Sequence, residues 1–98
     1  FRRSRGLGDV YKRQSIKKYQ IKSESFYLVS GSLQVLYGDE GCSDKQLMTK
    51  AVLKPGEVLS VPSGCPYSLM ALEDCVIIET ADRDNAVCEI IEKGGVEE

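Results

Sequence analysis

The chain has 98 residues, of which 42% are hydrophobic and 29% charged, and its formal net charge is −2. This length supports one domain with a single modest core. No run of about 18 apolar residues is present, which excludes a membrane-spanning helix, and the acidic balance argues against nucleic acid as a partner.

The first fourteen residues differ from the rest of the chain. They carry five of the thirteen basic residues and show neither an alternating nor a helical pattern of apolar positions. The hexapeptide Asp9–Gln14 resembles a translated sequencing adaptor, so residues 1–14 are predicted to be a non-native or disordered leader. The alternative is a basic arm that binds phosphate or an acidic partner. Without residues 1–14, eight Lys and Arg stand against fourteen Asp and Glu, a net charge of −6.

The next segments have the composition of β-strands. Residues 15–21 and 26–30 contain aromatic and β-branched side chains, and these residue types favour strands. Residues 33–37 alternate with the period of a strand that turns one face toward a core. Gly31 and Ser32 lie between two of these strands, and the pair predicts a hairpin turn.

A polar loop interrupts this pattern at residues 38–45. The loop holds three acidic residues, Asp39, Glu40 and Asp44, but they lack the ligand spacing of an EF-hand, so a solvated loop is favoured over a calcium site. Residues 46–53 return to a strand pattern. A turn at residues 54–57 follows, where Pro supplies a fixed φ and Gly a free one.

The stretch from Gly56 to Tyr67 combines a turn, a strand at Val58–Val61 and a second, rigid turn. Two prolines within residues 62–66 stiffen that second turn, which is how a loop presents a side chain to a cavity. Tyr67 is the side chain presented. Cys65 in the same turn is expected to be unreactive, because no neighbouring basic residue lowers the pKa of its thiol.

Three more apolar segments complete the chain: residues 67–72, 75–80 and 86–91. The final residues, 93–98, are charged and predicted to be a disordered tail. Many short strands with Gly and Pro turns, and no helical period, predict an all-β sandwich or barrel. The apolar positions expected inside it are Phe26, Leu28, Leu33, Val35, Val58, Val61, Val76 and Ile78. The four cysteines include no Cys-x-x-Cys and no secretion signal precedes them, so reduced thiols and a cytoplasmic location are expected.

Two motifs resemble the signature motifs of the cupin family. The spacing of Gly, Pro and Gly in residues 56–64, with Tyr67 presented after them, resembles the second motif. Glu24 and Gly31, with six residues between them, resemble the second half of the first motif. The resemblance covers residues 15–92 and implies a double-stranded β-helix, or jelly roll, that is truncated at its N-terminus.

Cupins of this kind hold a divalent metal with two His and the Glu of the first motif and one His of the second. Carried over to this chain, the three His positions fall on Lys18, Gln20 and Tyr67, and the Glu is kept as Glu24. Because the sequence contains no His, the imidazole ligands that suit transition metals are absent. We therefore expect neither a metal nor another cofactor.

The same four residues, Lys18, Gln20, Glu24 and Tyr67, offer donors and acceptors that suit a polyol or sugar. Alternatively, they satisfy one another inside a barrel that binds nothing. Residues 71–80 look similar to cupins described as mannose-6-phosphate isomerase-like, which implies a carbohydrate-like ligand.

Three functions stay open. The first is a metal-free domain that binds a small polar, carbohydrate-like ligand in the barrel. The second is a sugar-phosphate isomerase or epimerase that works by acid–base chemistry, with Glu24 as the base and Tyr67 as the acid. The third is a structural domain that forms a homodimer and binds no ligand.

Overall fold

The computed structural model describes residues 2–7, 12–82 and 88–96. Within these ranges the chain is almost entirely β-structure, with one short 3-10 helix at Lys45–Leu47. The strands are β1 (Arg2–Leu7), β2 (Lys12–Arg13), β3 (Ile16–Tyr19), β4 (Glu24–Ser30), β5 (Leu33–Tyr37), β6 (Thr49–Leu53), β7 (Val58–Val61), β8 (Tyr67–Ala71), β9 (Cys75–Ala81), β10 (Cys88–Glu92) and β11 (Gly95–Val96). No helix in this described part is long and apolar enough to cross a membrane.

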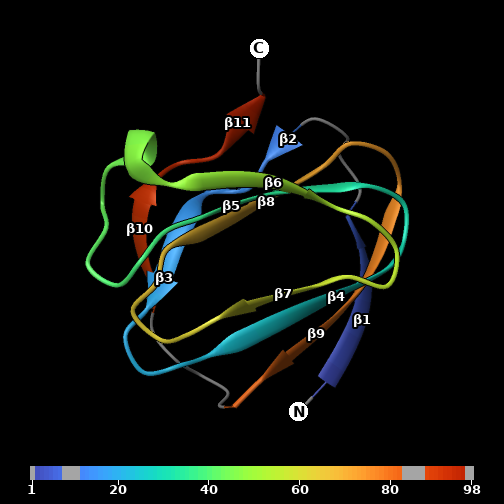
Figure 1. The fold of residues 1–98 in the computed structure, drawn as a ribbon, viewed down its shortest axis with the longest axis horizontal. Helices are drawn as coiled ribbons and strands as arrows, with labels where there is room; N and C mark the ends of the chain where they lie inside the picture. Colours follow the sequence, from blue (N-terminus) through green and yellow to red (C-terminus); the bar gives the residue numbers. More distant parts are fainter. Residues whose placement is uncertain (1, 8–11, 83–87, 97–98) are drawn as a thin grey trace.

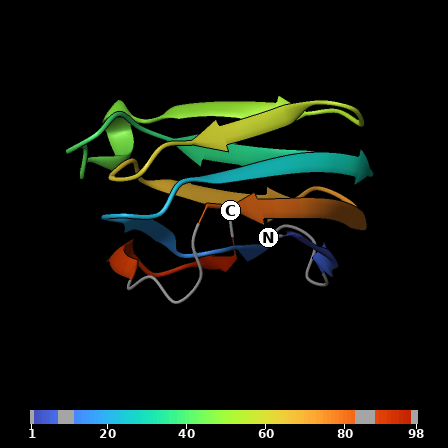
Figure 2. The same cartoon turned by 90° about the horizontal axis from the view of Figure 1, so that it is seen from below.

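Two antiparallel sheets face each other and enclose the core (Figure 1). One sheet has the strand order β1-β9-β4-β7, the other has the order β10-β3-β8-β5-β6, and β11 pairs with β2 in a short ribbon. Seen from below, β7, β4 and β9 lie side by side in one layer (Figure 2). This two-layered, antiparallel arrangement is that of a jelly roll and confirms the predicted all-β fold.

The turn at Gly31 and Ser32 connects the two sheets instead of closing a hairpin. β4 pairs with β7 and β9, whereas β5 pairs with β6 and β8 in the other sheet. The predicted hairpin is therefore wrong. Gly31 has φ +93°, and a Cβ at this position would lie 2.3 Å from the carbonyl oxygen of Asp74. Gly is needed here because the β4–β5 and β8–β9 connections pass very close to each other.

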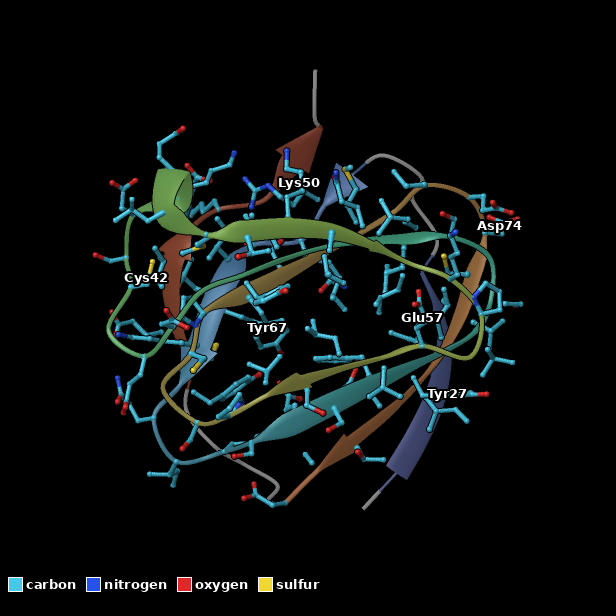
Figure 3. All side chains as sticks on the ribbon, in the orientation of Figure 1. Tyr27, Cys42, Lys50, Glu57, Tyr67 and Asp74 are labelled. Atoms are coloured by element: carbon cyan, nitrogen blue, oxygen red, sulfur yellow. The ribbon has the colours of Figure 1, made fainter. Side chains whose placement is uncertain are left out.

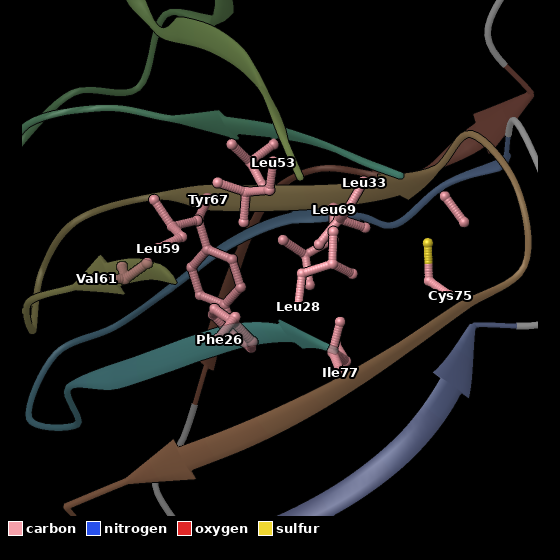
Figure 4. Packing of buried hydrophobic residues seen from close by; sticks show 12 residues of the cluster. Phe26, Leu28, Leu33, Leu53, Leu59, Val61, Tyr67, Leu69, Cys75 and Ile77 are labelled. Atoms are coloured by element: carbon pink, nitrogen blue, oxygen red, sulfur yellow. The ribbon is translucent and has the colours of Figure 1, made fainter. Parts of the chain in front are cut away.

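The core lies between the sheets and is built from their inward-facing side chains (Figure 4). Its buried members are Phe26, Leu28, Leu33, Val35, Leu53, Leu59, Val61, Tyr67, Leu69, Ala71, Cys75 and Ile77. Five of the eight predicted core positions are among them: Phe26, Leu28, Leu33, Val35 and Val61.

The other three predicted core positions are wrong. Val58 and Val76 are 52% and 42% exposed, and Ile78 is only half-buried. The neighbouring Leu59 and Ile77 take the inward positions. Successive side chains of a strand point to opposite faces, so an error of one residue in the phase moves the whole set to the wrong side. Where apolar residues follow one another without interruption, as in β9, no alternation fixes that phase.

The parts of the predicted leader and tail that the structure describes take part in strand pairing. β1 pairs with β9 over its whole length, and β11, inside the predicted tail 93–98, pairs with β2. The backbone N–H of Gln14 also donates to the carbonyl of Leu69 at 2.9 Å. The sequence predicts a leader and a tail without regular structure, whereas these described residues form paired strands. Strands pair through backbone groups, so side-chain periodicity is a poor guide at a sheet edge. Residues 8–11 lie outside the described part, and the adaptor origin of Asp9–Gln14 stays a prediction.

Candidate functional site

Tyr67 enters the space between the sheets from the rigid turn at residues 62–66 (Figure 3). Gly64 in this turn has φ +81°, a conformation that favours glycine. Its backbone N–H donates to the carbonyl of Tyr19 at 2.6 Å, which ties the turn to the end of β3. The sequence prediction that this turn presents Tyr67 to the interior agrees with the structure.

Three polar side chains meet in the interior, and we call Glu24, Tyr67 and Lys22 the Glu24 cluster. The Tyr67 hydroxyl donates a hydrogen bond to Oε1 of Glu24. The Nζ atom of Lys22 lies 3.4 Å from the other carboxylate oxygen, Oε2. Glu24 and Tyr67 are only 5% and 3% exposed. Both oxygens of the buried carboxylate thus have a partner, which is what burial of a charge requires.

Aromatic rings surround the Glu24 cluster. The ring of Phe26 lies 5.2 Å from that of Tyr67, centroid to centroid, with 46° between the planes. The Nζ atom of Lys17 lies 5.8 Å from the centroid of the Tyr67 ring, and that of Lys22 lies 4.4 Å from the centroid of the Tyr19 ring. An ammonium group at such a distance is attracted by the ring face, so both cations are held at the edge of the aromatic interior.

The environment of Tyr67 raises the pKa of its hydroxyl above the usual value. Burial is the main cause, and the hydrogen bond to Glu24 and the negative charge of that carboxylate act in the same direction. Tyr19 and the buried Glu79 add smaller contributions. Tyr67 therefore keeps its proton at ordinary pH and acts as a hydrogen-bond donor, and it is poorly suited to transfer the proton as a general acid.

The structure brings two of the four predicted site residues together, Glu24 and Tyr67, and places the other two elsewhere. The side chain of Lys18 lies with its Nζ atom 4.0 Å from Oε1 of the exposed Glu89. Gln20 is exposed in the bend that follows β3. The prediction that all four residues line one pocket is therefore wrong for Lys18 and Gln20.

The sequence prediction places Lys18 and Gln20 on the wrong face of β3, because it assigns the alternation of inward and outward residues along this strand one residue out of step. Tyr19 packs against the core and Lys17 lies over the Tyr67 ring, so the residue between them points to the opposite face. Sequence reasoning also missed Lys22, which precedes β4 and belongs to no periodic pattern. It missed Glu79 as well, although the correct phase of β9, with Ile77 inside, would have placed this carboxylate in the interior.

A cavity of about 640 Å³ opens over the paired strands β3 and β10 and the segments next to them. Its lining residues are Arg13, Gln14, Ser15, Lys17, Cys88, Ile90, Lys93 and Gly94. This volume lies within the range of small-molecule sites. Lys17 lines the cavity and also lies over the Tyr67 ring. Polar and apolar groups thus share the wall of one cavity, and Lys17 links this wall to the Tyr67 ring.

The residues at Glu24 do not fit the metal that the family resemblance implies. One carboxylate oxygen accepts the hydrogen bond of Tyr67, and the other faces the ammonium group of Lys22. A divalent cation bound to this carboxylate would meet a positive charge, and neither an imidazole nor a thiolate lies beside it to compensate. Within residues 2–7, 12–82 and 88–96, no three His, Cys, Asp or Glu side chains gather into a set that could hold a metal.

Cys65, in the turn before Tyr67, has a raised pKa. Burial is the first cause, and the negative charges of Glu40 and Asp39 add to it. A raised pKa leaves the sulfur as a thiol, the less nucleophilic form. The low reactivity expected of Cys65 stays a prediction, and the raised pKa of its thiol is consistent with it.

The fold and the site together define a small antiparallel β-barrel that carries a buried carboxylate at the start of one strand and a presented side chain at the start of another. A family model described as Cupin matches residues 18–94. The chain therefore belongs to the cupin family, as its two motifs indicated. A comparison with curated proteins finds no match.

Solved structures share the fold at low sequence identity. The dTDP-4-dehydrorhamnose 3,5-epimerase of Sulfolobus tokodaii has a TM-score of 0.73 and 14% identity, over 92% of this chain and 56% of that one. The CENP-C of Drosophila melanogaster, solved bound to CAL1, has a TM-score of 0.68 and 16% identity, over 81% and 59% of the two chains. A cupin-2 domain protein of Shewanella frigidimarina has a TM-score of 0.62 and 19% identity, over 91% and 68%. The chain thus spans only part of the length of these structures.

Proposed function

We propose that this chain is a metal-independent cupin domain that binds a small polar, carbohydrate-like ligand in the cavity that opens over β3 and β10. The observation that carries the proposal is the position of Lys17, which joins that cavity to the Glu24 cluster. The predicted binding position on β3 is thereby moved from Lys18 to Lys17.

The chemistry of the cavity supports a ligand of this class. Sugars combine hydroxyl groups with apolar ring faces, and they are bound where a few polar groups stand on a partly apolar wall. Ile90 and Cys88 contribute apolar surface, and Lys17 and Lys93 contribute donors. The resemblance of residues 71–80 to mannose-6-phosphate isomerase-like cupins supports a carbohydrate-like ligand but not an activity.

The acid–base enzyme is the weaker candidate. Its proposed acid, Tyr67, has a raised pKa and already donates its proton in a hydrogen bond to its proposed base, Glu24. In addition, the second oxygen of that base faces the ammonium group of Lys22. Both groups are thus engaged in the folded protein, which favours binding over proton transfer.

A titration followed by NMR tests the proposal. The protein, kept in a chelating buffer, is titrated with neutral hexoses and with hexose phosphates. We expect saturable shifts in β3 and β10, and a Lys17→Gln variant should weaken binding about tenfold, the effect of losing a hydrogen bond to a charged donor. Lys18→Gln is the matched control, because it removes the same charge one residue away on the other face of β3. The proposal fails if none of these ligands gives a saturable shift, or if both variants weaken binding equally.

A further inference from the structure

Lys22 lies in the connection between β3 and β4, outside both strands. Its side chain is only 15% exposed, and its Nζ atom lies 3.4 Å from Oε2 of Glu24. The same atom lies 4.4 Å from the centroid of the Tyr19 ring. A carboxylate and an aromatic face both attract a cation, so one ammonium group is held between two parts of the protein that favour its charge.

The other oxygen of this carboxylate is already engaged. The Tyr67 hydroxyl donates to Oε1 of Glu24, and the Tyr67 ring packs on the ring of Phe26 (Figure 4). Because Glu24 is only 5% exposed, water is a poor substitute for a lost partner of its charge. Oε2 therefore needs a donor with a positive charge, whether or not Lys22 supplies it.

Lys22 is an imperfect partner for this oxygen. Charge-assisted hydrogen bonds between an ammonium group and a carboxylate are about 2.7–2.9 Å long, whereas the distance here is 3.4 Å. The backbone on both sides of Lys22 is fixed to other parts of the protein. The N–H of Gly64 donates to the carbonyl of Tyr19 at 2.6 Å, and the N–H of Ser23 donates to Oδ1 of Asp82 at 2.9 Å. A free amine has no such attachment and can approach Oε2 more closely.

We infer that Glu24, Tyr67 and the ring of Tyr19 form a binding site for a primary ammonium group, and that Lys22 is the internal ligand that fills it in this structure. Lys22 leaves the site by rotation about its own side-chain bonds, without breaking the pairing of β3 or β4. A tethered group competes at an effective concentration on the order of millimolar. Lys22 therefore excludes weakly binding amines and is displaced by an amine that makes further contacts. This site is separate from the cavity over β3 and β10, which neither Lys22 nor Glu24 lines.

The chemistry of the site favours a primary amine over related compounds. A primary ammonium group carries the positive charge that the carboxylate and the ring attract, together with three N–H donors. A quaternary ammonium keeps the charge but has no N–H to donate to Oε2. An alcohol keeps a donor but lacks the charge. The primary ammonium satisfies both the carboxylate of Glu24 and the face of Tyr19.

Chemical rescue of the full chain tests the inference. Lys22→Ala removes the ammonium group and three methylene groups, and propylammonium chloride supplies the same chain and charge in solution. We expect Lys22→Ala to lower Tm by about 10 °C, because Oε2 loses its charged partner. Propylammonium at roughly 100 mM should restore about 5 °C or more, as mass action predicts for a Kd of about 10 mM. In the wild type, an NMR titration with propylammonium should shift the Lys22 side-chain signals saturably, at about tenfold higher concentrations, since Lys22 competes.

Matched controls separate this site from a general effect of the salt. Lys18→Ala removes the same side chain from an ion pair with the exposed Glu89, and propylammonium should change its Tm no more than sodium chloride does. Adding Glu24→Gln to Lys22→Ala removes the charge of the carboxylate and should abolish the rescue. Tetramethylammonium chloride and 1-propanol should each restore much less than propylammonium.

The inference is overturned if propylammonium gives no saturable rescue of Lys22→Ala, if 1-propanol or tetramethylammonium rescues equally well, or if the rescue persists with Glu24→Gln. If Lys22→Ala does not fold even with propylammonium, the wild-type titration decides. Saturable shifts of the Lys22 signals then support the site, and unchanged signals overturn it. None of these outcomes depends on the binding of hexoses in the cavity.

Discussion

Replacing Tyr67 by Phe removes one oxygen from the Glu24 cluster and keeps the ring. Oε1 of Glu24 then loses its donor while Glu24, only 5% exposed in the structure, stays buried. A buried acceptor that is left without a partner costs about 1–3 kcal/mol. The ring contact with Phe26 is preserved. We expect Tyr67→Phe to lower the free energy of unfolding by about 2 kcal/mol, which for a domain of this size lowers Tm by about 8–16 °C.

Urea and thermal unfolding measure this change. Tyr37→Phe is the control, because it removes the same atom from a half-buried tyrosine outside the Glu24 cluster. It should cost less than about 0.5 kcal/mol, the usual range for changes away from buried networks. If the two variants lose the same stability, the hydrogen bond between Tyr67 and Glu24 contributes nothing, and the reasoning is refuted.

The raised pKa of Tyr67 adds a pH dependence to this prediction. The unfolded chain loses the phenolic proton near pH 10, whereas the folded protein still holds it because burial and Glu24 raise the pKa. Stability from this group is therefore fully present below about pH 10 and falls as the pH rises beyond it. The stability difference between wild type and Tyr67→Phe should shrink between about pH 9 and pH 11. A difference that stays constant over this range would contradict the raised pKa.

Three further predictions concern the core, the N-terminal strands and the metal. Ile77→Ala should lower the free energy of unfolding by about 2–5 kcal/mol, because Ile77 is fully buried. Urea unfolding should show a smaller loss for Ile78→Ala, since Ile78 is half-buried. Equal losses would mean that the inward and outward residues of β9 are assigned wrongly. Deleting residues 1–14 removes β1 from its pairing with β9 and should lower Tm by about 5 °C or more, whereas an unchanged Tm would restore the expected leader. The triple variant Lys17→His, Tyr19→His and Tyr67→His should bind about one metal ion per chain by elemental analysis. The control Lys18→His, Gln20→His and Tyr67→His should bind none. The reverse result would restore the assignment of the family's His positions to Lys18 and Gln20.

Much of the fold follows from local sequence. Strand composition, the Gly and Pro turns and the rigid turn before Tyr67 depend on residues close together in the chain, and the structure agrees with them. The connection at Gly31 could not be assigned in the same way. A glycine with positive φ serves a hairpin and a crossover equally well, and the choice here depends on β5 pairing with β8, more than thirty residues away.

The candidate site depends on one more long-range fact, the phase of β3. Ile16 and Tyr19 are three residues apart and so point to opposite faces of the strand. If Ile16 is taken as the inward residue, Lys18 is inside; if Tyr19 is taken, Lys17 is inside. The two lysines are chemically identical, so composition cannot decide between them. The structure decides, because Ile16 is fully buried outside the core cluster, whereas Tyr19 packs against it. Ile16 and Tyr19 both pack against other parts of the protein. Only the residues that each one contacts show which of the two faces the barrel interior. On β3, the lysine that shares the inward face with Tyr19 is therefore Lys17 and not Lys18.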